Sequence, residues 1–150
     1  MIEIEFNDRD VLTALQNLQH TSGNLRPALA EIGEALTEST KQRFSAQAGP
    51  NGQRWPANSQ VTIERKGRDQ PLIGETGSLM DAIHYNLIGD DTLEIGSPME
   101  YAAMQQFGGT KGEFPHLWGN IPERPFLGVS ENDKNEILSI ISHYLASALE

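Results

Sequence analysis

Two short runs of alternating residues constrain this chain more than any other feature, because together they predict a β-hairpin with one apolar face. Residues 83–87 read IHYNL, residues 93–95 read LEI, and the turn-forming residues GDD lie between them at 89–91. Successive side chains of a strand point to opposite faces, so a period of two gathers the apolar side chains on one face. That face has to be covered, and its predicted members are Ile83, Tyr85, Leu87, Leu93 and Ile95.

Three segments with apolar residues at helical spacing are available to cover the hairpin. Asp8 or Asp10 is expected to cap the first helix, and Pro27 suits the first turn of the second, which runs to about Ala46. The Ser-x-x-Asp sequence at 130–133 predicts a capping box at the start of the last helix. The apolar positions of the three helices are Val11, Leu12, Leu15 and Leu18, then Leu29, Ile32, Leu36 and Phe44, and finally Ile137, Leu138, Ile141, Leu145, Ala148 and Leu149.

Shorter elements complete the predicted fold. Residues 2–6 read IEIEF, whose alternation predicts a strand with its apolar residues facing the helices, and RPFLGV at 124–129 indicates another extended segment. A capping box at 97–100 opens a predicted helix from 99 to about 107, which Gly108 ends. We therefore predict an α+β fold in one domain, residues 1–150: a small, mainly antiparallel sheet with the N-terminal helices and the C-terminal helix packed on one face.

Charge and composition exclude several classes of protein. The 150 residues carry a formal net charge of −10, so a nucleic-acid backbone is repelled. The absence of cysteine removes disulfide frameworks and thiolate metal sites. The sequence has no run of 18 apolar residues, so no membrane span is predicted. Its first ten residues, MIEIEFNDRD, have acidic residues where a signal peptide needs positive charge. We therefore expect a cytoplasmic protein unless an assembly carries it out of the cell.

Residues with catalytic or metal-binding chemistry are scattered. The histidines at 20, 84, 116 and 143 lack the close spacing of zinc ligands, and GGTKGE at 108–113 lacks the spacing of a phosphate-binding loop. No catalytic residue, cofactor or metal is therefore predicted. Two alternatives stay open: a hydrolase that uses His84 or His116 with a nearby carboxylate, and a nucleic-acid-binding adaptor that uses the basic residues of 54–68.

Two distinctive motifs, here called phrases, flank the loop that we call the framed loop. They are YAAMQQFGG at 101–109 and IPERPFLG at 121–128. Their aromatic residues are expected to pack into the core, the glycine pair permits a sharp exit from the helix, and the prolines hold the returning chain extended. A tryptophan is similarly expected to anchor the long loop at 47–71, although a partner contact is the alternative. The residues with these packing roles are Trp55, Tyr101, Phe107, Gly108, Gly109, Pro125 and Phe126.

The framed loop carries an apolar cluster, Phe114, Leu117 and Trp118. An apolar cluster in a loop is typical of a surface that meets a partner, and a small satellite core folded back on the domain is the equally weighted alternative. Arg124 stands between two prolines, and arginine is favoured in ion pairs at interfaces. We therefore predict a contact surface formed by these four residues.

Four phrases, in order, give the chain a resemblance to the phage virion morphogenesis family, the tail-completion proteins of Mu-like and P2-like phages and prophages. They are GPNGQRWP at 49–56, IGETGSLMDAIHY at 73–85, IGSPMEYAAMQQFGG at 95–109 and IPERPFLGVS at 121–130. The resemblance covers about two thirds of the chain. One departure is Gln106, where many members of this family are expected to have histidine before Phe-Gly.

The resemblance implies a structural protein rather than an enzyme. It implies a protein that completes the tail and enables stable joining of head and tail, with a fold like that of phage tail-terminator and head–tail joining proteins. Its partners would be other tail and connector proteins, in a homo-oligomeric ring, commonly of six subunits. The protein would act in the host cytoplasm during assembly and then reside in the virion, at the tail or the head–tail junction. The negative charge would let genomic DNA pass nearby without specific binding.

Overall fold

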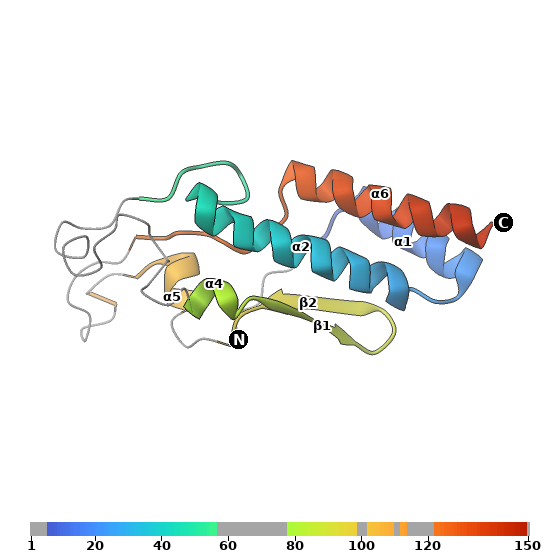
Figure 1. Cartoon of the computed structure of the whole chain (residues 1–150), viewed down its shortest axis with the longest axis horizontal. Coiled ribbons are helices and arrows are strands. Elements are labelled where there is room, and N and C mark those ends of the chain that lie inside the picture. The colour runs from blue at the N-terminus through green and yellow to red at the C-terminus, as the bar shows by residue number, and fades with distance from the viewer. Residues whose placement is uncertain (1–5, 57–77, 99–101, 110–111, 114–121, 150) are drawn as a thin grey trace.

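A computed structural model describes residues 6–56, 78–98, 102–109, 112–113 and 122–149. The described elements follow the order α-α-α-β-β-α-α (Figure 1). They are α1 (Arg9–Ser22), α2 (Arg26–Ala46), α4 (Ser78–Asp81), β1 (His84–Ile88), β2 (Thr92–Gly96), α5 (Ala102–Phe107) and α6 (Glu131–Ala148). The α+β class is therefore confirmed, with a two-stranded antiparallel sheet within these residues.

The long helix α2 is the centre of the arrangement. One side of α2 packs against α6, which in turn packs against α1, and another side packs against the hairpin of β1 and β2 (Figure 1). The short helices α4 and α5 lie together near the C-terminal end of α2, away from the end of the molecule where α6 finishes (Figure 1). Helices thus cover one face of the sheet, as predicted, but α2 makes the direct contact.

The helix ends follow the chemistry of their capping residues. The Asp8 carboxylate accepts a hydrogen bond of 3.1 Å from the Val11 amide, which identifies Asp8 rather than Asp10 as the cap of α1. Pro27 lies in the first turn of α2, and both halves of the capping box of α6 form between Ser130 and Asp133. Gly108 has φ 72°, a left-handed conformation that glycine adopts at no steric cost and that suits the exit from α5.

The hairpin has the predicted register. Tyr85 lies opposite Ile95 and Leu87 lies opposite Leu93, and these side chains are half-buried while Asn86 is exposed. Leu87, Leu93 and Ile95 pack against the core cluster formed by α1, α2 and α6. The period-two pattern therefore identified the face of the sheet that meets the helices.

Two segments that the sequence predicts as extended strands differ in the structure. Phe6 is not in a strand and its side chain is 42% exposed, while residues 2–5 of the same prediction lie outside the described residues. Residues 124–129 form no strand and pair with no described strand. Two apolar positions assigned to helix stripes, Leu12 and Leu149, are exposed as well. The start of the predicted helix at 99–101 also lies outside the described residues.

Buried side chains form two clusters at the two ends of α2. The larger cluster joins α1, α2 and α6, and the smaller one is centred on Phe44, Trp55 and Phe126. The rings of Phe44 and Trp55 meet edge to face at 5.5 Å, and those of Phe44 and Phe126 lie 5.6 Å apart. None of the helices in the described part of the chain is long and apolar enough to cross a bilayer.

Candidate contact surface around helix α5 and the strap

Residues 124–128, here called the strap, are fastened to the body by side chains rather than by a neighbouring strand. Gln106 of α5, which is 5% exposed, makes the central connection. Its side-chain oxygen accepts hydrogen bonds of 3.0 Å from the amides of Phe126 and Leu127, and its side-chain nitrogen donates to the Leu127 carbonyl at 3.2 Å. A buried amide group needs partners, and one side chain here satisfies three backbone groups.

A second contact between α5 and the strap closes the base of the framed loop. The Arg124 amide donates to the carbonyl oxygen of Gln105 at 2.7 Å. Because Gln105 precedes the loop and Arg124 follows it, this hydrogen bond and those of Gln106 hold the two ends of residues 108–123 together. The two phrases that the sequence analysis singled out therefore meet in space at this base.

Trp55 and Arg43 fasten the strap from the other side. The indole nitrogen of Trp55 donates to the Pro125 carbonyl at 2.8 Å, and its side chain is buried. Residues 57–71 of the long loop lie outside the described residues, so the anchoring of that loop by Trp55 stays a prediction. Arg43 of α2 donates to the carbonyl oxygens of Phe126 at 2.6 Å and Gly128 at 3.1 Å. Four consecutive residues of the strap thus have their carbonyl groups bonded to side chains of three separate elements.

The buried Arg43 guanidinium also pairs with a carboxylate. Its second terminal nitrogen bonds Asp133 at the start of α6, and the same carboxylate accepts from the Ser39 hydroxyl at 2.5 Å and the Ser130 amide at 3.0 Å. Burial lowers the pKa of the Arg43 guanidinium, and the Asp133 carboxylate opposes this shift. A buried charge needs such partners, so α2, α6 and the strap are tied at one point.

Glycine and proline residues pack reciprocally where the strap meets the 49–52 turn. A Cβ atom on Gly128 would lie 2.7 Å from the Pro50 ring, and one on Gly49 would lie 2.9 Å from the Pro125 carbonyl oxygen. Gly128 also has φ 145°, a conformation that L side chains rarely adopt. These close approaches explain why the GPNG and RPFLG phrases occur together in one sequence.

Phe107 departs from the sequence-based prediction that it packs into the core. Its side chain is 57% exposed, whereas Phe126, as expected, is fully buried. Neighbouring residues of a helix point about 100° apart, so the inward direction of Gln106 turns Phe107 outward. An exposed aromatic side chain consequently stands directly before Gly108, at the base of the framed loop.

The other predicted contact residues have two outcomes. Arg124 is largely buried, and its side-chain Nε donates to the Pro56 carbonyl at 2.9 Å, so in this structure it holds the 54–56 segment against the strap. Its part in an interface stays a prediction. Phe114, Leu117 and Trp118 lie outside the described residues, as does Tyr101, and their roles also stay predictions.

The alternatives of a hydrolase and a nucleic-acid adaptor gain no support. The Nδ1 atom of His84 lies 2.9 Å from the Ala82 carbonyl oxygen, which can only accept, so that nitrogen is engaged as a donor with the backbone. His116 and all of residues 57–68 lie outside the described residues, and Arg54 is exposed. Among the residues that the structure describes, no three His, Cys, Asp or Glu side chains converge to hold a metal.

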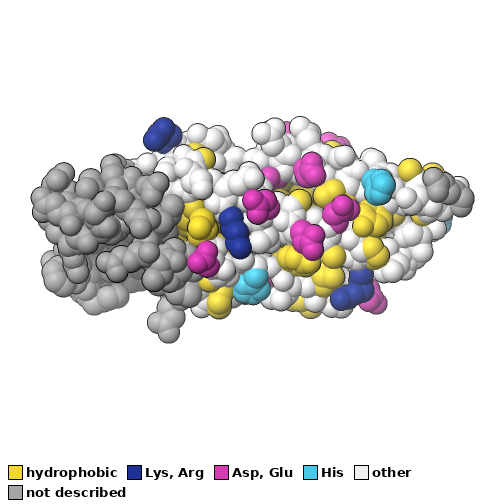
Figure 2. Space-filling view, in the orientation of Figure 1, with side chains coloured by type: hydrophobic (Ala, Val, Ile, Leu, Met, Phe, Trp, Pro, Cys, Tyr) yellow, Lys and Arg dark blue, Asp and Glu magenta, His cyan; other side chains and the backbone are white. Residues whose placement is uncertain are grey.

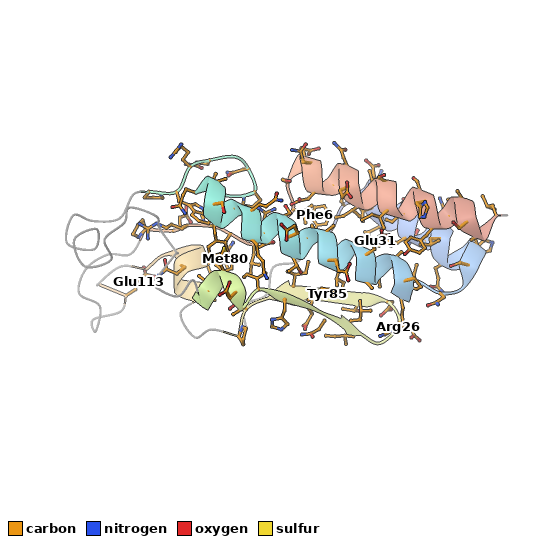
Figure 3. The ribbon with its side chains drawn as sticks, viewed as in Figure 1. Phe6, Arg26, Glu31, Met80, Tyr85 and Glu113 are labelled. Atoms are coloured by element: carbon orange, nitrogen blue, oxygen red, sulfur yellow. The ribbon has the colours of Figure 1, made fainter. Side chains whose placement is uncertain are left out.

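Acidic side chains and one apolar groove mark the helical part of the surface. Asp and Glu side chains gather over the middle of the face in Figure 2. Along α2 the side chains of Glu31 (Figure 3), Glu34 and Glu38 are exposed. A groove of about 540 Å³ lies between the helices, β2 and the end of the strap, with the exposed side chains of Phe6 and Leu12 among its lining. The groove reaches the strap at Leu127 and Gly128.

The geometry defines a small α+β protein whose most distinctive described residues pack the strap against α2 and α5. Residues 6–146 match the sequence profile of the phage virion morphogenesis family, and the chain belongs to that family. This is a family of structural phage proteins, not one of known enzymes. The resemblance read from the four phrases is confirmed.

Three relatives agree with this membership. The chain is 34% identical to the putative capsid assembly protein G of Escherichia phage Mu over 79% of this chain and 78% of that protein. It is 32% identical to the Mu-like prophage FluMu G protein 2 of Haemophilus influenzae, over 96% of each chain. It is 28% identical to the tail completion protein S of Escherichia phage P2, over 93% of this chain and 95% of that protein. No solved structure matches the chain, so the likeness to tail-terminator folds stays a prediction.

Proposed function

We propose that this protein completes a phage tail and enables its stable joining to the head, as a subunit of a ring. Membership of the virion morphogenesis family and the tail completion protein among its relatives support the first part. In this role it would bind other tail and connector proteins, assemble in the host cytoplasm and remain in the virion. The observation that carries the proposal is the exposed Phe107 at the clamped base of the framed loop.

The exposure of the Phe107 side chain supports a contact with a partner, because burying an apolar side chain lowers the free energy. Burying a phenylalanine side chain contributes about 1.5–3 kcal/mol, and a folded chain without a partner leaves most of that gain unrealised here. The residue is also held in place, because the hydrogen bonds of Gln106 fix the last turn of α5. A contact residue that is already ordered loses little conformational entropy on binding.

A ring requires two different surfaces on each subunit that meet head to tail. We place one at the α5 end, with the framed loop, and the other on the N-terminal helices, beside the apolar groove. The net charge of −10 and the acidic residues along α2 suit a ring through which genomic DNA passes without specific binding, because negative charge repels the phosphates.

The test uses a phage that carries Phe107→Ser, with Ile88→Ser and Leu149→Ser as matched controls. Both control residues are exposed apolar side chains, at 47% and 72%, and neither lies in α5 or the strap. We expect Phe107→Ser phage to accumulate filled heads and finished tails that stay apart, counted by electron microscopy, while both controls produce joined particles. Normal joining in the Phe107→Ser phage would refute the assigned contact surface.

Ring formation is tested separately on the purified protein. Light scattering and negative-stain imaging, alone and with tails that lack this protein, should reveal a closed oligomer in at least one condition. The variant with Phe114, Leu117 and Trp118 all changed to Ser should then keep its melting temperature and lose the assembly. A chain that is a strict monomer and never associates with tails contradicts the proposal.

A further inference from the structure

We infer that Gln106 is the positioning residue of the proposed contact surface, the group that holds Phe107 outward and keeps the framed loop closed at its base. That a partner binds at Phe107 rests on the proposed function. That Gln106 fixes the direction of Phe107 rests on the hydrogen bonds between Gln106 and the strap. It assigns a role to a buried polar residue that touches no partner itself.

The hydrogen-bonding pattern shows what chemistry the position needs. One oxygen must accept from two consecutive amides, those of Phe126 and Leu127, and one N–H must donate to the Leu127 carbonyl. An apolar side chain of similar length supplies none of these groups. Neutral imidazole supplies one acceptor and one donor, whereas protonated imidazole has two donors and no acceptor.

The connection to Phe107 is direct, because the two residues are adjacent in the last turn of a helix of six residues. When the Gln106 side chain is bonded to the strap, the helix has one rotational setting, in which Phe107 points to solvent. Without those bonds the larger apolar side chain gains by turning inward. Loss of Gln106 should then remove the contact surface while α1, α2 and α6 keep their own core.

The test compares the wild-type protein with Gln106→Met and Gln106→His by two readouts. The first is amide hydrogen exchange at Phe126 and Leu127, with the amides of α6 as a control for the fold. We expect exchange at the two strap amides to become at least about tenfold faster in Gln106→Met, because their acceptor is gone, while α6 stays protected.

The second readout is sedimentation with tails that lack this protein, from about pH 5.5 to about pH 8. Free histidine titrates near pH 6.5, and burial at this position lowers the pKa of the introduced histidine. Gln106→His should therefore associate like the wild type at the upper end and lose association, relative to the wild type, as the pH falls through that lowered pKa. The charged side chains on the strap (Arg124), bonded to it (Arg43) or paired with Arg43 (Asp133) are the same in all three proteins. The wild-type pH profile therefore corrects for them.

The outcomes separate this inference from the proposed function. Unchanged exchange at Phe126 and Leu127 in Gln106→Met, or a Gln106→His profile with the same pH dependence as the wild type, overturns the inference. A wild-type protein that never associates with tails overturns the proposed function, and the exchange experiment still decides whether Gln106 holds the strap.

Discussion

The aromatic ring of Tyr85 on β1 lies directly against Gly33 in the middle of α2 (Figure 3). A Cβ atom at Gly33 would lie 2.6 Å from two ring carbons. Alanine in place of glycine inside a helix usually stabilises by about 1 kcal/mol, but a forced overlap costs about 1–3 kcal/mol. We therefore expect Gly33→Ala to lower the free energy of unfolding, measured by urea denaturation.

The double variant Gly33→Ala with Tyr85→Leu provides the control. If the overlap with the ring is the cause, the double variant should be more stable than the sum of the two single changes predicts. Strict additivity would place the cost of Gly33→Ala elsewhere.

Phe126 within the strap and Phe107 beside it should respond in opposite ways to truncation. Phe126 is fully buried against Phe44, and removing a buried phenylalanine side chain costs about 3–5 kcal/mol, so Phe126→Ala should unfold or fail to accumulate. Phe107→Ser should leave the melting temperature nearly unchanged. Thermal unfolding followed by circular dichroism distinguishes them, and equal destabilisation by both changes would show that Phe107 belongs to the core.

Arg43→Met should be among the most damaging single changes in the described part of the chain. It leaves the Asp133 carboxylate buried without its cation and removes the donor to the Phe126 and Gly128 carbonyls. Breaking a buried ion pair costs about 3–5 kcal/mol. Adding Asp133→Asn should recover part of the loss in urea unfolding, and a double variant that is no better than Arg43→Met would contradict this account.

The ion pairs of Lys134 predict a pH-dependent part of the stability. A hydrogen bond from Lys134, followed by one from the Val11 amide, lowers the pKa of Asp8 below 3.8, and Asp8 and Asp10 raise the pKa of Lys134 above 10.5. Because its pKa is lowered, the Asp8 carboxylate stabilises the fold above pH 3.8, and this stabilisation is lost as the pH falls through the pKa of the folded state. The lysine contribution is present below pH 10.5 and is lost as the pH rises through its folded value.

Lys134→Met should therefore lower the melting temperature slightly at neutral pH and low salt. The difference from wild type should shrink at about 1 M salt, and again as acid protonates Asp8. Lys41→Met removes the same charge from α2 and serves as the control. A loss that persists in acid and high salt would indicate packing of the lysine stem rather than the ion pairs.

Local patterns predicted the parts of the fold whose causes are local. Asp8 caps α1, Pro27 starts α2 and the 130–133 box starts α6, each through bonds within a few residues. The hairpin face followed from a period of two, and it is confirmed by the burial of Tyr85 and Leu87 relative to Asn86. Family membership followed from short phrases in a fixed order.

The packing of α5 against the strap depends on long-range bonds that no local pattern contains. Hydrophobicity alone favours burying Phe107 in preference to Gln106. The strap amides of Phe126 and Leu127 need an acceptor, however, and of these two side chains only the glutamine supplies one. Arg43 falls on the buried side of α2 with Leu36, Thr40 and Phe44, a position at which helical spacing predicts an apolar residue. A cation at such a position indicates a buried partner.

Arg43, Trp55 and Gln106 hydrogen-bond to peptide groups of the strap, which every residue possesses. Its length is consequently under a stricter constraint than its composition. Deleting or inserting a single residue between Pro125 and Gly128 would move each later carbonyl away from its donor, and it would also separate Gly128 from Pro50. Diversification of this protein among phages should therefore proceed by substitution at strap positions other than Phe126 and Gly128, and by changes of loop length only beyond the strap.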